Sequence, residues 1–171
     1  MQIDRRNLLS LSGLALLAAC GGGEPAVGPD GTPLPTVYKI SEKDAAAIPY
    51  RVLDSINALR SAKGAPALVL NSSLNAAAAT HSRDMSVQNR PWHFGSDGSS
   101  PIVRAQRAGY SGTVLGELIS ETYETEVETL SAWMKQADTR QILMDARATQ
   151  MGFAWYQEAG GKLWWTLLTG T

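Results

Sequence analysis

Apolar side chains near the start of the folded region recur at helical spacing. Val52, Ile56 and Leu59 fall at positions i, i+4 and i+7, a periodicity that predicts an amphipathic helix. We expect this helix to end near Gly64, because a glycine commonly closes a helix. Residues 68–70 follow as a short apolar insertion.

A second helix is predicted directly after this insertion. Asn71, Ser72 or Ser73 can cap it, because each side chain can accept a hydrogen bond from an N–H of the first turn. One face of the helix then carries Leu74, Ala77, Ala78, His81 and Met85. His81 is therefore expected to point toward the interior.

Two further helices and a strand are predicted in the middle of the chain. Ser100 and Pro101 supply the cap and the first position of a third helix, which Gly109 closes. Residues 114–120 have the composition of a strand, and residues 125–128 form a capping box for a fourth helix. The inward residues of that helix should be Val127, Leu130 and Met134.

The C-terminal part of the chain predicts a β-hairpin. Met151, Phe153 and Trp155 alternate with other residues, the glycine pair 160–161 supplies the turn, and residues 163–168 return. The returning strand is apolar on both faces, so it needs cover on both sides. We therefore predict an α+β fold, an α-β-α sandwich with a small antiparallel three-stranded sheet between helical layers.

Composition indicates one domain with appendages and limits the partners. The chain has 171 residues, 44% of them hydrophobic, and a formal net charge of −1. No run of lysine and arginine forms a basic stripe, so we expect no nucleic-acid partner, and we expect a monomer. Cys20 is the single cysteine, which excludes a disulfide framework within the chain.

The first 19 residues have the features of an export signal. Arg5 and Arg6 precede an apolar stretch, residues 8–19, that is too short to span a bilayer. Residues 17–20, Leu-Ala-Ala-Cys, resemble the lipobox of bacterial lipoproteins, which implies cleavage before Cys20 and acylation of its thiol. An ordinary secretory signal or an uncleaved helix is the alternative. The arginine pair also resembles a twin-arginine export signal.

A proline- and glycine-rich segment separates this signal from the domain. Residues 20–45 contain too little apolar surface to fold alone, so we interpret them as a flexible tether after the lipidated cysteine. Residues 37–40 form a short extended patch that can dock on the domain. The domain itself is assigned to residues 46–171.

Two polar side chains lie among apolar neighbours and need partners. His93 belongs to the stretch Pro-Trp-His-Phe-Gly of residues 91–95, and Glu117 belongs to Gly-Glu-Leu-Ile in the strand of residues 114–120. Burying either group without a partner costs roughly 1–3 kcal/mol or more. The nearest solution is for each to pair with the other, and that pairing defines a candidate site.

Several short motifs, each weak alone, occur together in the order and spacing of a known family. They are Ile56–Arg60, Ala77–Met85, Trp92–Pro101, Arg107–Tyr110, Gly116–Ile119, Trp133 and Met151–Phe153. From about residue 48 onward the chain resembles the superfamily of cysteine-rich secretory, antigen 5 and pathogenesis-related 1 proteins (CAP), in its bacterial SCP-like form without cysteines. The resemblance implies an α-β-α sandwich.

The resemblance also implies a cleft lined by two histidines and two glutamates, which binds zinc through the histidines in some members. His93 and Glu117 occupy the first histidine and first glutamate positions, but Gln136 and Thr139 stand at the second ones. Because a zinc site needs three or four ligands, we expect no tight metal site and no cofactor. Zinc held by His93 and Glu117 is the alternative. Other nearby acidic residues are expected to be solvated: Glu121, Glu124, Glu126 and Glu128.

Two other groupings suggest chemistry but have simpler explanations. We expect His81 to be a core histidine bonded to a backbone carbonyl or to Asp84, with a ligand role as the alternative. Ser96 and Asp97 lie near His93 and suggest a Ser-His-acid hydrolase. The same residues are ordinary in turns, however, and the chain has no Gly-x-Ser-x-Gly motif.

These features predict an extracytoplasmic, lipid-anchored, non-catalytic binding module of the cell envelope. Its ligand would be a lipid, a cell-wall component or a protein, held in the cleft around His93 and Glu117. The alternative is a metal-assisted or His/Glu-dependent hydrolase of cell-wall or peptide substrates, which the residues Gln136 and Thr139 disfavour. A third interpretation is a structural envelope protein whose cleft has no binding or catalytic role. Gly21, rather than aspartate, follows the cysteine, which favours the outer membrane.

Overall fold

The computed structural model describes residues 37–122 and 124–171. The predicted signal sequence, the arginines Arg5 and Arg6 and the lipidation site Cys20 lie outside the described residues. Within the described part of the chain, no helix is long and apolar enough to cross a membrane.

The described residues form five helices and four strands, and the sequence predicts most of them. In chain order they are α1 (Glu42–Ala62), β1 (Val69–Leu70), α2 (Ser72–Gln88), α3 (Pro101–Arg107), β2 (Val114–Thr122), α4 (Glu126–Lys135), α5 (Ala137–Leu143), β3 (Gln150–Gln157) and β4 (Leu163–Gly170). The predicted caps form as expected. Asn71 accepts hydrogen bonds at the start of α2, Ser100 caps α3, and Thr125 and Glu128 form the capping box of α4.

The sheet has four strands in the order β1-β3-β4-β2. β3, β4 and β2 are antiparallel, as predicted, and β1 adds a parallel edge of two residues beside β3. The parallel pairing follows from two backbone hydrogen bonds, from Val69 N to Thr149 O and from Asn71 N to Met151 O. The sheet is therefore mixed rather than purely antiparallel, because the apolar insertion before α2 joins its edge.

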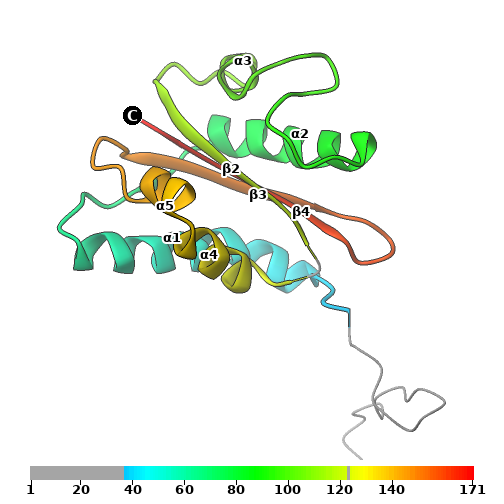
Figure 1. The fold of residues 1–171 in the computed structure, drawn as a ribbon, viewed down its shortest axis with the longest axis horizontal. Helices are drawn as coiled ribbons and strands as arrows, with labels where there is room; N and C mark the ends of the chain where they lie inside the picture. Colours follow the sequence, from blue (N-terminus) through cyan, green and yellow to red (C-terminus); the bar gives the residue numbers. More distant parts are fainter. Residues whose placement is uncertain (1–36, 123) are drawn as a thin grey trace, which may run out of the picture. The chain divides into compact units, whose positions relative to one another are not determined.

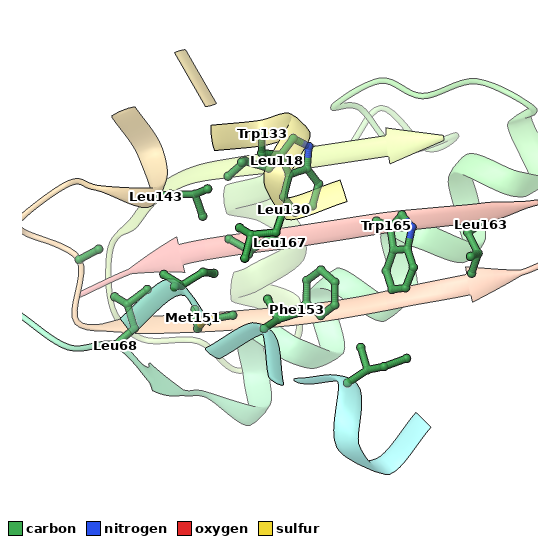
Figure 2. Packing of buried hydrophobic residues seen from close by; sticks show 14 residues of the cluster. Leu68, Leu118, Leu130, Trp133, Leu143, Met151, Phe153, Leu163, Trp165 and Leu167 are labelled. Carbon is green, nitrogen blue, oxygen red and sulfur yellow. The ribbon is translucent and has the colours of Figure 1, made fainter. Parts of the chain in front are cut away.

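Helices cover both faces of this sheet, which gives the predicted α-β-α sandwich. α2 and α3 lie on one face, and α1, α4 and α5 lie on the other (Figure 1). All eight residues of β4 are buried, as a central strand between two helical layers requires. Figure 2 shows the core beneath α1 and α4, where the rings of Phe153 and Trp165 stack at 5.4 Å on neighbouring strands.

The folded region begins earlier than the sequence predicts. α1 starts at Glu42 with Ser41 as its cap, within the segment that we interpreted as a tether. The preceding residues dock on the hairpin, because Ile40 N donates to Gln157 Oε1 at 3.0 Å and Gln157 Nε2 donates to Tyr38 O at 2.7 Å. The extended patch therefore packs on the domain as expected.

Two predicted helix faces differ from the observed ones. Leu59 is 38% exposed, whereas Arg60 is buried and donates to the carbonyl oxygens of Leu143 and Ala148. On α4, Val127 is 54% exposed, and Trp133 is buried instead. Apolar spacing alone could not show that a guanidinium satisfied by several carbonyls takes a core position.

Candidate functional site

Glu117 lies in the middle of β2, at the edge of the sheet. It is opposite Leu168 of β4, a residue of the core cluster beneath α2. Because directly opposite residues of antiparallel strands point to the same face, the Glu117 side chain faces α2 and α3. The residue is only 6% exposed, so its carboxylate must be satisfied by protein groups.

Both carboxylate oxygens of Glu117 accept hydrogen bonds. His93 Nδ1 donates to Oε1 at 2.9 Å, and Arg104 Nη2 donates to Oε2 at 2.5 Å. A second histidine is close, with His81 Nε2 at 3.7 Å from Oε1. The structure therefore brings His93 and Glu117 together, as the sequence predicts, and adds Arg104 and His81 around the same carboxylate.

Arg104 also fixes the loop that carries His93. Its Nη1 donates to His93 O at 3.0 Å and to Ser99 O at 2.8 Å. The residue is 5% exposed, and its Nε has no hydrogen-bond partner. Sequence reasoning missed Arg104. The available signal was its place on the inward face of α3 beside Ala105, because a buried carboxylate favours a cation as partner.

His81 is buried completely and behaves as a core histidine. Its Nε2 donates to Trp92 O at 2.9 Å, and its Nδ1 has no partner. Burial lowers the pKa of His81, and the nearby Glu117 carboxylate opposes that shift while Arg104 adds to it. The imidazole is therefore held in the neutral form. Its hydrogen bond to the backbone carbonyl of Trp92 supports the loop that carries His93.

His93 stands at the surface beside two aromatic residues. Its side chain is 51% exposed, and Phe94 is 47% exposed. The rings of Trp92 and Phe94 lie 5.6 Å apart, and the Arg90 guanidinium lies 3.8 Å from the Trp92 ring centroid. With Nδ1 directed at Glu117, the imidazole presents Nε2 as the nitrogen available to a ligand.

The two positions that depart from the family pattern lie at the junction of α4 and α5. Thr139 Oγ1 donates to Trp133 O at 2.5 Å, so its hydroxyl joins the two helices. Gln136 is exposed and precedes α5. Among the described residues, no hydrogen bond or ion pair connects Gln136 or Thr139 with His93 or Glu117.

The residues of this site do not fit a zinc ion. In the part of the chain that the structure describes, no group of three or more histidine, cysteine, aspartate or glutamate side chains is placed to hold a metal. Arg104 occupies Oε2 of Glu117, and His93 Nδ1 occupies Oε1. A tetrahedral zinc site needs more ligands than the exposed imidazole nitrogen of His93 provides.

The other acidic residues of this region have structural roles, and one prediction about them is wrong. Glu126 is buried rather than solvated and accepts hydrogen bonds from Tyr38 and Arg51. Burial and the Glu126 carboxylate raise the pKa of Tyr38 to about 12. Glu121 pairs with Lys162, and Glu128 belongs to the capping box of α4.

Ser96 and Asp97 do not form a hydrolytic set with His93. Ser96 Oγ donates to Asp84 Oδ1 at 2.6 Å, and Asp97 accepts from Arg107 and from Ser99 N. Side-chain hydrogen bonds of this kind are typical of turns, as the sequence also predicts for these residues.

Comparisons with known proteins agree with this architecture. The family model described as "Cysteine-rich secretory protein family" matches residues 53–168. An outer surface protein of Borrelia burgdorferi has a similar structure, with a TM-score of 0.68 and 17% identity over 80% of this chain and 98% of its own. No curated protein is significantly similar to the chain.

Two longer bacterial proteins have a domain of the same fold. An extracellular protein of Bacillus anthracis with an SCP domain has a TM-score of 0.67 and 20% identity over 78% of this chain. A cysteine-rich secretory protein of Staphylococcus aureus has a TM-score of 0.60 and 16% identity over 84% of this chain. The chain spans 44% of the length of each.

Proposed function

The chain belongs to the cysteine-rich secretory protein family, and from this premise we propose that it is a lipid-anchored, non-catalytic binding module of the bacterial cell envelope. The ligand is a lipid, a cell-wall component or a protein that contacts the exposed ring of His93. Membership of a family does not fix an activity, so the proposal depends on the site itself.

The observation that carries the proposal is the burial of the Glu117 carboxylate beneath Arg104 and His93. Its side chain is 1% exposed, and its two oxygens accept from Arg104 and His93. A general base needs a lone pair within reach of a substrate proton. Because Glu117 presents none at the surface, its role is to orient the His93 imidazole.

His93 is then a rigidly held contact at the surface. The bond to Glu117 fixes the ring, and Arg104 fixes the backbone at the same residue. Exposed aromatic side chains next to an oriented polar group are typical of binding surfaces. The neighbouring residues Phe94, which is 47% exposed, and Trp92, which is half-buried, supply apolar area and contact each other.

The cellular location is inferred from the N-terminal sequence and from the relatives. Residues 17–20 resemble a lipobox, and two structural relatives carry the descriptions "outer surface protein" and "extracellular protein". Together these observations support an extracytoplasmic domain tethered through acylated Cys20. Gly21 favours the outer membrane in bacteria that sort lipoproteins by this position.

One observation favours the alternative, a His/Glu-dependent hydrolase. A histidine whose Nδ1 faces a buried carboxylate and whose Nε2 faces solvent has the orientation of a general base in hydrolases. What is missing is a nucleophile, because Ser96 Oγ is directed to Asp84 rather than to His93. The alternative therefore requires an activated water.

Binding and turnover assays on the same protein distinguish the two functions. The wild-type chain and His93→Ala are incubated with purified cell-wall sacculi and with phosphatidylethanolamine/phosphatidylglycerol vesicles, and co-sedimentation and released products are measured. We expect co-sedimentation that His93→Ala weakens by about tenfold, without products. Tyr50→Ala is the matched control, because Tyr50 is 62% exposed on α1. Soluble wall fragments that appear with the wild type and vanish with His93→Ala would support the hydrolase.

A further inference from the structure

A pocket between α2 and α3 is lined by neither His93 nor Glu117. Its volume is about 450 Å³, within the range of small-molecule sites. It is lined by the charged residues Asp84, Asp97, Arg104 and Arg107 and by the small residues Ala76 and Ala108. The pocket opens beside α2 and α3, the helices on the upper face of the sheet in Figure 1.

Three of the four charges in this pocket take part in ion pairs. Arg104 pairs with Glu117, and Arg107 pairs with Asp97. The Ser99 hydroxyl and Arg107 hold the pKa of Asp97 well below its usual range, so this carboxylate stays ionised. Each pair is neutral as a whole, although Arg107 keeps N–H groups that Asp97 does not use.

Asp84 is the remaining charge, and no cationic side chain of residues 37–122 and 124–171 pairs with it. Among the described residues, its carboxylate accepts hydrogen bonds from neutral groups, namely Ser96 N at 2.7 Å, Ser96 Oγ at 2.6 Å and Gln88 Nε2 at 2.9 Å. A carboxylate that is hydrogen-bonded but not paired attracts an external cation. One part of the pocket therefore favours a ligand with a positive group.

Arg107 offers unused hydrogen-bond donors in the same pocket. Its Nη1 donates to Asp97 Oδ2, and the described residues provide no partner for its other N–H groups. The guanidinium fork matches a carboxylate with two parallel hydrogen bonds. Asp97 contacts Nη1 of this guanidinium, so its remaining N–H groups are left to donate to a negative planar group of a ligand.

We propose that this pocket binds a small zwitterion of the amino-acid or short-peptide class, with its ammonium at Asp84 and its carboxylate at Arg107. The small side chains of Ala76 and Ala108 leave room for a short aliphatic side chain of the ligand. The site is independent of the function proposed for His93, because neither His93 nor Glu117 lines the pocket.

Calorimetric titration of the full chain in detergent solution tests the proposal with three probes. Dialanine carries both charges, N-acetyl-dialanine keeps the carboxylate alone, and dialaninamide keeps the ammonium alone. We expect dialanine to bind with a dissociation constant at least about tenfold lower than that of either blocked probe. Absence of saturable dialanine binding up to about 10 mM would overturn the proposal. Equal binding of all three probes would also overturn it.

Variants assign each end of the ligand to its residue. Asp84→Asn keeps an acceptor for Ser96 and should abolish the preference for dialanine over N-acetyl-dialanine. Arg107→Ala should abolish the preference for dialanine over dialaninamide. Arg147→Ala is the matched control, because Arg147 is also exposed and paired with an aspartate, Asp145, but does not line the pocket. Preferences that persist in both pocket variants would contradict the assignment.

Discussion

At the scale of single residues, the site is a carboxylate with three basic neighbours. Glu117 is almost fully buried, and Arg104, His93 and His81 all lie within 3.7 Å of its oxygens. Only one of the three, His93, reaches the surface. The burial of Glu117 therefore organises the loop of residues 91–99, and the ligand would meet His93 rather than the carboxylate itself.

Removal of the Glu117 carboxylate should strongly destabilise the fold. Glu117→Ala leaves the Arg104 guanidinium buried without its counter-charge, which should lower the free energy of unfolding by about 3–5 kcal/mol. Urea denaturation measures this difference. Glu124→Ala is the control, because Glu124 is exposed, and its effect should stay within about 0.5 kcal/mol. Equal midpoints for the two variants would show that Glu117 is not a buried partner of Arg104.

Stability should depend on pH through His81. Its folded-state pKa lies below the ordinary value of 6.5 because burial disfavours the charged imidazole, although Glu117 and Asp84 oppose that effect. As the pH falls from about 7 to 5, the unfolded chain therefore takes up the proton first, and stability is lost. For this single proton the slope has an upper limit of about 1.4 kcal/mol per pH unit.

Unfolding free energies of the wild type and of His81→Gln at pH 7.5 and 5.5 check this prediction. The glutamine amide can still donate to Trp92 O but does not titrate. Its pH dependence should be shallower than that of the wild type. Identical pH dependences of the unfolding free energy in the two proteins would show that His81 does not cause the loss of stability.

At the scale of elements, the sequence predicts the helices and the hairpin because their signals are local. The caps at Asn71, Ser100 and Thr125 and the alternation in β3 depend on neighbouring residues only. The His93–Glu117 pair could be predicted because both groups lie in apolar surroundings and need a partner. The sequence could not show that Arg104 rather than Arg107 is the partner of Glu117. Arg104 is the buried one because of how α3 packs against β2.

The burial of charged residues on α1 and α4 could not be predicted from local sequence either. Arg60 is buried because four carbonyl oxygens from distant turns converge on its guanidinium, and no local pattern encodes that convergence. Glu126 is buried because Tyr38 and Arg51 reach it from the N-terminal segment and from α1. Tertiary partners thus decide the burial of these charged residues, which local spacing does not predict.

The contact between α2 and β3 depends on Gly152. A Cβ atom at this residue would lie 2.2 Å from the backbone carbon of Leu74 and 2.3 Å from Asn75 N. Gly152→Ala must therefore push α2 away from the sheet, and we expect a loss of about 3 kcal/mol in thermal or urea unfolding. Gly160→Ala has nothing within 4 Å of its Cβ and should change stability by less than about 0.5 kcal/mol. Two similar losses would contradict this packing account.

At the scale of the whole molecule, the proposed function requires that the folded domain is joined to a membrane anchor. The domain begins with the docked segment before α1, and Cys20 precedes the first described residue, Val37, by 17 positions. A lipid on Cys20 would therefore hold His93 and the pocket of Asp84 close to the envelope. Both sites would then meet ligands of the cell surface.

The anchor is tested by Cys20→Ser in a bacterial host. Without the thiol no lipid can be attached, so the protein should move from the membrane fraction to the soluble extracytoplasmic fraction. Immunoblots of fractionated cells measure the shift, and the wild type is the reference. If Cys20→Ser stays with the membranes, the apolar segment of residues 8–19 is retained as an uncleaved helix instead.

If the His93–Glu117 pair binds its ligand without metal chemistry, the domain should not take up zinc, which a calorimetric zinc titration measures. We predict no saturable zinc binding with a dissociation constant of about 1 μM or tighter, because the Glu117 carboxylate already accepts hydrogen bonds from Arg104 and His93. Sub-micromolar zinc binding to the wild type that is lost in His93→Ala would contradict the account.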